Sequence, residues 1–173
     1  MFDDLKGKIV VVTGGVTGIG GGGSLAFAAA GGKGFAPDLG GGKELEAIEK
    51  AGIATLKLDL TEDSAPQKLI DAVVAKYGRI DVLVNNAGSL VARIPVTELD
   101  DDFIDRVFDL NCRQLVHCCR IAAKQMKAQG SGRMIFTSSI TGPKVSSPGH
   151  GHYSASKGGI NGFIKAASVE FAP

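Results

Sequence analysis

Short apolar runs alternate with helical patterns along this chain. The first run, KIVVVT at 8–13, is β-branched, too short for a helix and ended by glycine, so it predicts a strand buried on both faces. Further strands are expected at 33–38, 54–59, 80–85 and 134–137. Helices are expected between or after them, at 21–32, 62–77, 101–129 and 153–171.

Strands that alternate with helices of this length form βαβ units. Such units place a parallel sheet between two layers of helices, so we expect an α/β fold with a doubly wound parallel sheet in three αβα layers. The 173 residues suit one domain with a sizeable core. Because no repeat or interdomain linker interrupts the pattern, residues 1–173 are expected to form a single domain.

Charge and composition argue against several classes of function. The 19 basic and 18 acidic residues are spread along the chain and leave a net charge of +1, which does not suit nucleic acid or a membrane surface. No stretch resembles a signal core or approaches the ~20 apolar residues of a membrane span, so we expect a cytoplasmic protein. Cys112, Cys118 and Cys119 lack the paired spacing of a zinc site and are expected to be small buried thiols.

The residues that follow each strand carry the candidate chemistry, because parallel sheets bind ligands at the carboxyl ends of their strands. TGGVTGIG at 13–20 follows the first strand and opens a helix, where free amides and the helix dipole suit a pyrophosphate. Such a glycine run alone could also be a linker. Asp38 follows the second strand, where a carboxylate would accept hydrogen bonds from an adenosine ribose, although alone it could be a solvated loop residue.

The last expected helix begins with YSASK at 153–157. Residues four apart share a helix face, so Tyr153 and Lys157 can point into one cleft. A phenol has a pKa of about 10, and a neighbouring ammonium lowers it, which makes the pair a candidate general acid and base. Alone, such a pair is more often surface packing. His150 and His152 lack a carboxylate or cysteine cluster, so they indicate a solvated loop or a substrate-cleft lining, and no metal site is expected.

Five motifs in order resemble the short-chain dehydrogenase/reductase family over residues 5–173. They are TGGVTGIG, NNAG at 85–88, an isolated Asn111, the serine pair at 138–139 and YSASK. The chain is most similar to bacterial 3-oxoacyl-[acyl-carrier-protein] reductase-like members and to polyol or sugar dehydrogenases. The resemblance implies a Rossmann-type fold and an oxidoreductase that interconverts a secondary alcohol and a ketone by hydride transfer. It also implies a homotetramer or dimer formed through the two long helices.

The same resemblance implies a catalytic set of four residues. Tyr153 would protonate the carbonyl oxygen or deprotonate the alcohol, and Lys157 would bind the nicotinamide ribose and lower the phenol pKa. Ser139, rather than Ser138, would hold the substrate oxygen, because the second serine of the pair is the catalytic one in the family. Asn111 would orient a water that links Lys157 to solvent.

The cofactor-binding residues implied by the resemblance come from four strand ends and the last helix. They are Gly14, Thr17, Gly18, Ile19, Gly20, Asp38, Leu39, Asp59, Leu60, Asn85, Ala87, Gly88, Tyr153 and Lys157. Asp38 would repel a 2′-phosphate, and Thr17 occupies a position that is often basic in enzymes preferring NADP, so NAD is expected. Lys33 and Lys43 leave NADP open as the alternative.

Two departures from the family pattern affect these expectations. Family members are longer, so we expect a carboxyl-terminally incomplete domain that lacks the last strands of the fold. That would permit a second class of function, a non-catalytic nucleotide-binding or assembly module, although the retained catalytic set favours an enzyme. Glycine at 22, 23, 32 and 34 replaces residues that are usually apolar, which predicts a weakened first helix.

Overall fold

The computed structural model describes residues 3–42 and 44–172 and contains one sheet of five parallel strands. The strands are β1 (Ile9–Val12), β2 (Lys33–Asp38), β3 (Ala54–Lys57), β4 (Val82–Asn85) and β5 (Arg133–Phe136). Their order is β3-β2-β1-β4-β5, so the chain winds outward to β3 and then returns to the other side of β1. This order confirms the expected doubly wound sheet and creates a switch point between β1 and β4.

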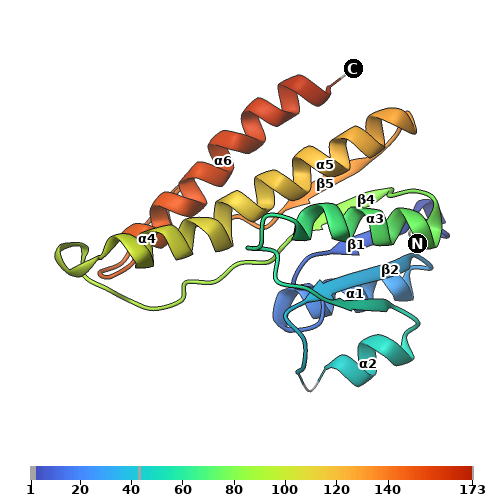
Figure 1. Ribbon diagram of the computed structural model, residues 1–173, viewed down its shortest axis with the longest axis horizontal. Helices are drawn as coiled ribbons and strands as arrows, with labels where there is room; N and C mark the ends of the chain where they lie inside the picture. Colours follow the sequence, from blue (N-terminus) through green and yellow to red (C-terminus); the bar gives the residue numbers. More distant parts are fainter. Residues whose placement is uncertain (1–2, 43, 173) are drawn as a thin grey trace.

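Helices cover both faces of the sheet (Figure 1). Helices α1 (Gly18–Ala29) and α2 (Leu45–Lys50) lie on one face, and α3 (Ala65–Tyr77) and α5 (Gln114–Ala128) lie on the other. Helix α4 (Asp101–Phe108) continues into α5 through a π turn, Asp109–Arg113, and the long α6 (Gly151–Phe171) packs against α4. Two short 3-10 turns, Asp3–Leu5 and Val96–Glu98, complete the described elements.

The expected elements are present, but several of their ends differ. Helix α1 begins at Gly18, within the glycine motif at 13–20, and α6 begins at Gly151. Helix α3 starts with Pro66 in its first turn, where the missing amide hydrogen is tolerated. The expected single helix at 101–129 is divided by the π turn, and α2 was not expected because six residues are too few to show a helical period.

Apolar side chains fill both spaces between the sheet and its helices. On the α3 and α5 face the core contains, among others, Val11, Phe35, Leu69, Val73, Leu83, Cys118, Ala122 and Met126. On the α1 and α2 face it contains Val16, Ala36, Ile48 and Ile53. The expectation of buried thiols is confirmed for Cys118 and Cys119, and burial raises the pKa of Cys118 to about 12 and that of Cys119 to about 11.

Helix α1 contains four consecutive glycines with two different environments. A Cβ at Gly20 would overlap the carbonyl oxygen of Gly14, and at Gly21 it would lie 2.6 Å from a backbone oxygen of the preceding turn. At Gly22 and Gly23 it would meet nothing within 4 Å. Close packing therefore requires the first two glycines but not the other two.

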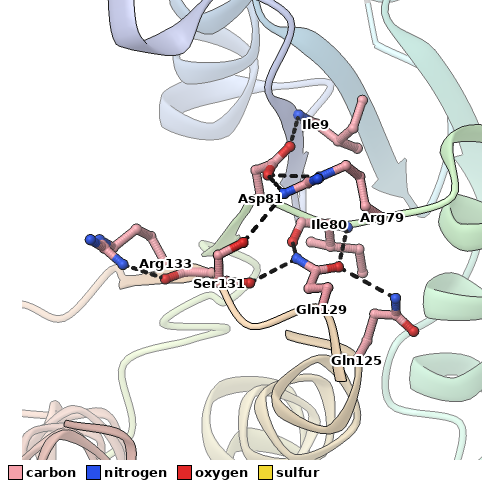
Figure 2. Close-up of polar contacts among 9 residues, drawn as sticks. Ile9, Arg79, Ile80, Asp81, Gln125, Gln129, Ser131 and Arg133 are labelled. Carbon is pink, nitrogen blue, oxygen red and sulfur yellow. Dashed lines mark hydrogen bonds and ion pairs between the residues drawn. The ribbon is translucent and has the colours of Figure 1, made fainter. Parts of the chain in front are cut away.

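A polar network joins elements at the amino ends of the central strands, opposite their carboxyl ends (Figure 2). The Asp81 carboxylate accepts hydrogen bonds from the Ile9 amide at 2.8 Å and from the Arg79 guanidinium at 2.7 Å and 3.0 Å. Burial raises the pKa of Asp81, but these donors outweigh burial and hold the pKa below its usual value. Gln129, just after α5, donates to the Ile80 carbonyl, so β1, β4 and α5 are joined at the amino ends of these strands.

Candidate active site

A cavity of about 580 Å³ lies at the carboxyl ends of the strands. Its wall combines the turn before α1, the end of β2, the loop after β3, the turn after β4, residues 137–139 and two side chains of α6. Because β3 and β5 are the outer strands, the loop at 58–61 and the residues beside β5 lie at opposite ends of the cavity. This is the position expected for a dinucleotide in a doubly wound sheet.

The glycine turn presents backbone amides to this cavity. Gly14 and Gly18 have φ values of 59° and 55°, a left-handed conformation that glycine adopts without steric strain. A Cβ at Gly14 would also lie 3.2 Å from the Cα of Ala87. Thr17 precedes α1 without capping it through its side chain, and Thr17, Gly18 and Ile19 line the cavity. Uncapped amides at a helix N-terminus suit a pyrophosphate.

Asp38 is held at the end of β2 by two backbone amides. Its Oδ2 accepts a hydrogen bond from Val16 at 3.2 Å and its Oδ1 accepts one from Gly40 at 3.3 Å. Each carboxylate oxygen keeps a further lone pair, so the side chain can still accept ribose hydroxyls. Lys33 begins the same strand, roughly 16 Å away at about 3.3 Å per residue, and therefore does not reach this site. Lys43 lies outside the described residues.

Asn86 joins three strand ends beneath the cavity. Its Nδ2 donates to the carbonyl oxygens of Thr13 at 3.1 Å and Gly14 at 3.4 Å, and its Oδ1 accepts from the Thr137 hydroxyl at 3.3 Å. The Thr13 hydroxyl oxygen in turn accepts hydrogen bonds from the amides of Asn86 and Ala87 at 2.9 Å and 3.0 Å. The turns after β1 and β4 are thereby fixed to each other.

Two residues expected at the cofactor surface do not line the cavity. Asn85 is the last residue of β4 and only 1% exposed, and because neighbouring residues of an extended chain project to opposite sides, Asn86 faces the cavity instead. Gly20 lies behind the turn, where it lets α1 approach Gly14 closely. The remaining expected cofactor residues, including Leu39, Asp59, Leu60 and Gly88, all line the cavity.

Tyr153 and Lys157 line the same end of the cavity. Lys157 is only 4% exposed, and its Nζ lies 5.7 Å from the centre of the Tyr153 ring. Nζ also donates a hydrogen bond of 2.9 Å to the carbonyl oxygen of Thr137. Burial lowers the pKa of Lys157, and the nearby Cys112 opposes that shift. Helical spacing thus brings a phenol and an ammonium to one wall.

Ser138 and Ser139 follow β5 and both line the cavity. The Ser139 Oγ accepts a hydrogen bond of 3.0 Å from the Thr141 amide, which leaves its hydroxyl hydrogen free to donate. The Ser138 Oγ is buried without a partner among the described residues. Ser139 is therefore oriented by the chain while its donor remains available to a substrate oxygen.

Asn111 lies in the π turn and is fully buried, so it does not line the cavity itself. Its Oδ1 accepts from the Ser89 amide at 3.0 Å and its Nδ2 donates to the Ser89 carbonyl at 2.9 Å. A Cβ at Gly88 would lie 2.6 Å from the Asn111 Oδ1 and 3.6 Å from the Lys157 Nζ. Gly88 therefore lies between the two side chains.

The two histidines before Tyr153 have different environments. His152 is buried, with Nε2 3.3 Å from the Leu90 carbonyl and its ring 4.9 Å from that of Phe103, so the expectation of a solvated or cleft-lining side chain is wrong for it. The His150 ring lies edge-on to Tyr153 at 6.4 Å. Within residues 3–42 and 44–172, no group of three potential metal ligands comes together.

Several cavity residues were not predicted from the sequence. They are Pro37, Leu58, Thr61, Asn86, Ser89, Leu110, Gln114, Thr137 and Ser138. Most are immediate neighbours of expected site residues at strand ends. Leu110 and Gln114 are four residues apart on one helix face, and no motif points to either of them.

The comparisons with known proteins agree with this geometry. Residues 8–173 match the family model for short chain dehydrogenases. The chain is 32% identical to a 3-oxoacyl-[acyl-carrier-protein] reductase of Thermotoga maritima, covering 97% of this chain and 70% of that protein. It is 36% identical to a 2-dehydro-3-deoxy-D-gluconate 5-dehydrogenase of Pseudoalteromonas atlantica, covering 97% of this chain and 68% of that protein.

Solved structures show the same likeness. The crystal structure of an NADH-dependent reductase complexed with NAD has a TM-score of 0.91 and 33% identity, covering 99% of this chain and 76% of that one. The chain belongs to the short-chain dehydrogenase/reductase family. It is accordingly an oxidoreductase of the class that acts on CH–OH groups with a nicotinamide cofactor. None of the helices in the described part of the chain could cross a membrane.

Proposed function

We propose that this protein interconverts a secondary alcohol and a ketone with NAD, using Tyr153 as the acid and base. The observation that carries this proposal is the convergence of Tyr153, Lys157 and Ser139 on one end of the dinucleotide-sized cavity. When bound, the nicotinamide supplies a hydride to the ketone or accepts one from the alcohol. The chain's own residues then have to position the substrate oxygen and move one proton.

Tyr153 and Ser139 act on the substrate oxygen. The Ser139 hydroxyl donates a hydrogen bond to it, and the Tyr153 phenol delivers a proton to it during reduction or removes one during oxidation. The positive charge of Lys157 stabilises the phenolate that remains after proton transfer. These three groups account for the proton that accompanies the hydride.

Lys157 and Asn111 complete the proposed set behind the phenol. Lys157 binds the hydroxyls of the nicotinamide ribose, and the backbone around Asn111 holds a water that returns protons to Lys157 from solvent. The position of Gly88 supports this arrangement, because without a side chain there it leaves only a short gap between Asn111 and Lys157. The two hydrogen bonds between the Asn111 side chain and the Ser89 backbone keep that gap constant.

Asp38 is the proposed basis for choosing NAD over NADP. It lines the cavity, and Thr17 in the facing turn carries no positive charge. A 2′-phosphate would therefore meet a carboxylate without a cation to neutralise it among the lining residues of that turn. The NAD complex of the similar reductase supports the same choice.

The proposed substrate is a polyol, a sugar acid or a 3-oxoacyl thioester. The thioester and the sugar acid rest on the names of two similar proteins, one a 3-oxoacyl reductase and one a sugar-acid dehydrogenase, and the polyol rests on the family resemblance of the sequence. We further propose a cytoplasmic homotetramer or dimer that packs through α5 and α6 and binds its cofactor within one domain. Light scattering at defined concentrations measures the assembly, and a monomer at all concentrations would contradict it.

The decisive experiment follows NADH absorbance with a panel of 2-dehydro-3-deoxy sugar acids, 3-oxoacyl thioesters and simple ketones. The Tyr153→Phe variant keeps the aromatic ring beside Lys157 but cannot give up a proton. We expect its kcat to fall by about 10²–10⁴-fold while NADH still binds. Equal turnover by wild type and variant would refute the catalytic role, and NADH binding without turnover of any substrate by the wild type would favour a binding module.

A further inference from the structure

His152 is a buried histidine that the proposed chemistry does not use. It lies in the first turn of α6, immediately before Tyr153, and is only 3% exposed. Successive residues of a helix project about 100° apart, so His152 does not line the cavity that Tyr153 lines. Its ring packs edge-on against that of Phe103 in α4, with 4.9 Å between the ring centres. A phenylalanine could make that contact, so the imidazole needs another explanation.

The Nε2 atom of His152 joins α6 to the loop after β4. It lies 3.3 Å from the carbonyl oxygen of Leu90. Because a carbonyl oxygen can only accept a hydrogen bond, Nε2 carries the hydrogen and donates it. The other ring nitrogen, Nδ1, is buried without a partner among the described residues. A backbone hydrogen bond of 3.1 Å from Ile94 to Gly149 joins the same two segments further along.

The loop segment that His152 contacts has a strained backbone. Within the described part of the chain, Val91 is the one residue other than glycine with positive φ, at 67°, and this conformation is an outlier for a β-branched side chain. The amide of Ala92 donates to the Leu90 carbonyl at 2.9 Å and closes a γ-turn around Val91. The cost of such a backbone is similar in size to the stabilisation from one hydrogen bond. A single bond from His152 can therefore decide whether the turn persists.

Each partner of this hydrogen bond is the neighbour of a residue that lines the cavity. Leu90 directly follows Ser89, which lines it. His152 directly precedes Tyr153, which also lines it. The Ser89 backbone is already held by the Asn111 side chain. The bond from His152 therefore sets how far the phenol lies from the turn after β4.

Resting on the proposed function, we propose that His152 is a positioning residue for proton transfer by Tyr153. Its hydrogen bond holds the strained turn at Val91 against the amino end of α6 and so fixes the phenol relative to the turn after β4. Proton transfer requires the substrate oxygen to lie within hydrogen-bond reach of the phenol. A displaced phenol lowers the rate rather than the cofactor affinity, because the pyrophosphate turn and Asp38 lie at the ends of β1 and β2.

The test separates the donor of His152 from its ring. His152→Phe keeps an aromatic ring against Phe103 but has no donor, whereas His152→Gln, the matched control, keeps an N–H donor. Kinetics of NADH oxidation use the compound of the panel that the wild type reduces fastest, and calorimetry measures the dissociation constant of NADH. We expect kcat to fall about tenfold or more in His152→Phe and to stay within about threefold of wild type in His152→Gln. The dissociation constant should stay within about twofold of wild type in both variants.

A further variant tests the strained turn. Asparagine adopts positive φ more readily than valine, so Val91→Asn reduces the need for the hydrogen bond from His152. The loss of kcat caused by His152→Phe should be smaller by about threefold or more in the Val91→Asn background than in the wild type. An equal loss in both backgrounds overturns the inference, because the bond would then not act through the turn.

The same measurements keep the inference apart from the proposed function. Unchanged kcat in His152→Phe, or an equal loss in His152→Phe and His152→Gln, overturns the inference and leaves the proposed function standing. Failure of the wild type to turn over any compound of the panel overturns both. If His152→Phe does not fold, His152→Met, which also lacks a donor and packs adaptably, takes its place and should show the same loss of kcat.

Discussion

The ammonium of Lys157 is fixed to the carbonyl oxygen of Thr137 by a hydrogen bond of 2.9 Å. Thr137 directly follows β5, so the sheet itself, rather than Tyr153, sets the position of the charge. The amide of Thr137 is in turn bonded to the carbonyl of Asn85 at the end of β4. The end of the cavity that Tyr153 and Lys157 line is therefore built on two adjacent strand ends.

Replacing Lys157 by Gln tests the need for its charge. A glutamine amide can still donate a hydrogen bond towards Thr137, so we expect the fold and melting temperature to change little. Because the charge that stabilises the phenolate is lost, kcat should fall by about 10²-fold or more. Steady-state kinetics of NADH oxidation and a thermal melt check both parts, and near-normal kcat would show that the charge is not required.

Gly88→Ala tests the narrow gap between Asn111 and Lys157. The added Cβ would lie 2.6 Å from the Asn111 Oδ1, so either the side chain or the turn after β4 must shift. We expect kcat to fall by about tenfold or more, because displacement of a positioning group at a reacting centre is costly. Gly162→Ala in α6 is the matched control, since a Cβ there meets nothing within 4 Å, and it should leave kcat unchanged.

Asp38→Ala tests cofactor choice through a ratio. We expect kcat/KM for NAD relative to NADP to fall by about tenfold or more, because the variant removes both the ribose acceptor and the repulsion of a 2′-phosphate. The individual kcat/KM values for NAD and NADP will also change, since Asp38 accepts hydrogen bonds from the Val16 and Gly40 amides. Asp59→Ala, in the loop after β3, should keep the ratio. An unchanged ratio in Asp38→Ala would contradict ribose recognition.

The glycines of α1 allow a matched test of packing against helix propensity. Gly22→Ala adds a methyl group into open space, so it should stabilise the protein by roughly 1 kcal/mol. Gly20→Ala drives a Cβ into the Gly14 carbonyl oxygen and should destabilise the protein and weaken NAD binding. Urea unfolding and calorimetry measure these effects. The same sign of change in both variants would show that packing at Gly20 is not limiting.

Asp81 predicts a pH dependence of stability. Its folded-state pKa lies below its ordinary value, so its contribution is complete above the unfolded-state pKa of about 4 and is lost as pH falls through the folded pKa. Asp81→Asn removes the contribution of the ionised carboxylate and should lower the free energy of unfolding at pH 7 by about 1–3 kcal/mol. Urea unfolding from pH 7 down to pH 3 should then show a shallower acid loss for the variant, and parallel curves would contradict the prediction.

Much of this fold follows from the sequence because buried parallel strands are short apolar runs separated by long periodic segments. The strands and long helices were predicted for that reason. Helix α2 was missed, because LEAIEK follows a glycine-rich loop and buries only Ile48. Helix α1 was predicted at 21–32 but spans Gly18–Ala29. The sequence alone also does not show that close contact requires glycine at position 20 but not at position 22.

The part of the site that was predicted is the part that belongs to sequence motifs. Tyr153 and Lys157 were paired by helical spacing, Ser139 was chosen by the family resemblance, and the glycine turn was identified by its position after a strand. All of them line one cavity in the structure. Asn85 was placed at the cavity in error, because whether a strand residue faces the ligand depends on which of two neighbours points that way. Gln114 was not predicted to line the cavity, because the orientation of its side chain depends on a change in backbone hydrogen bonding that has no signature in the sequence.

The π turn at Asp109–Arg113 also changes the angular positions of residues around the axis of the helix that it interrupts. Phe103, Val107, Asn111 and Leu115 are all buried and recur every four residues, a spacing that drifts by about 40° at each step in a regular α-helix. The wider turn absorbs that drift. Removing Leu110 or Cys112 would keep Asn111 and every other motif in the sequence yet rotate all of α4 relative to α5. The rotation of this helix about its axis thus determines which of its side chains line the candidate active site and which are buried.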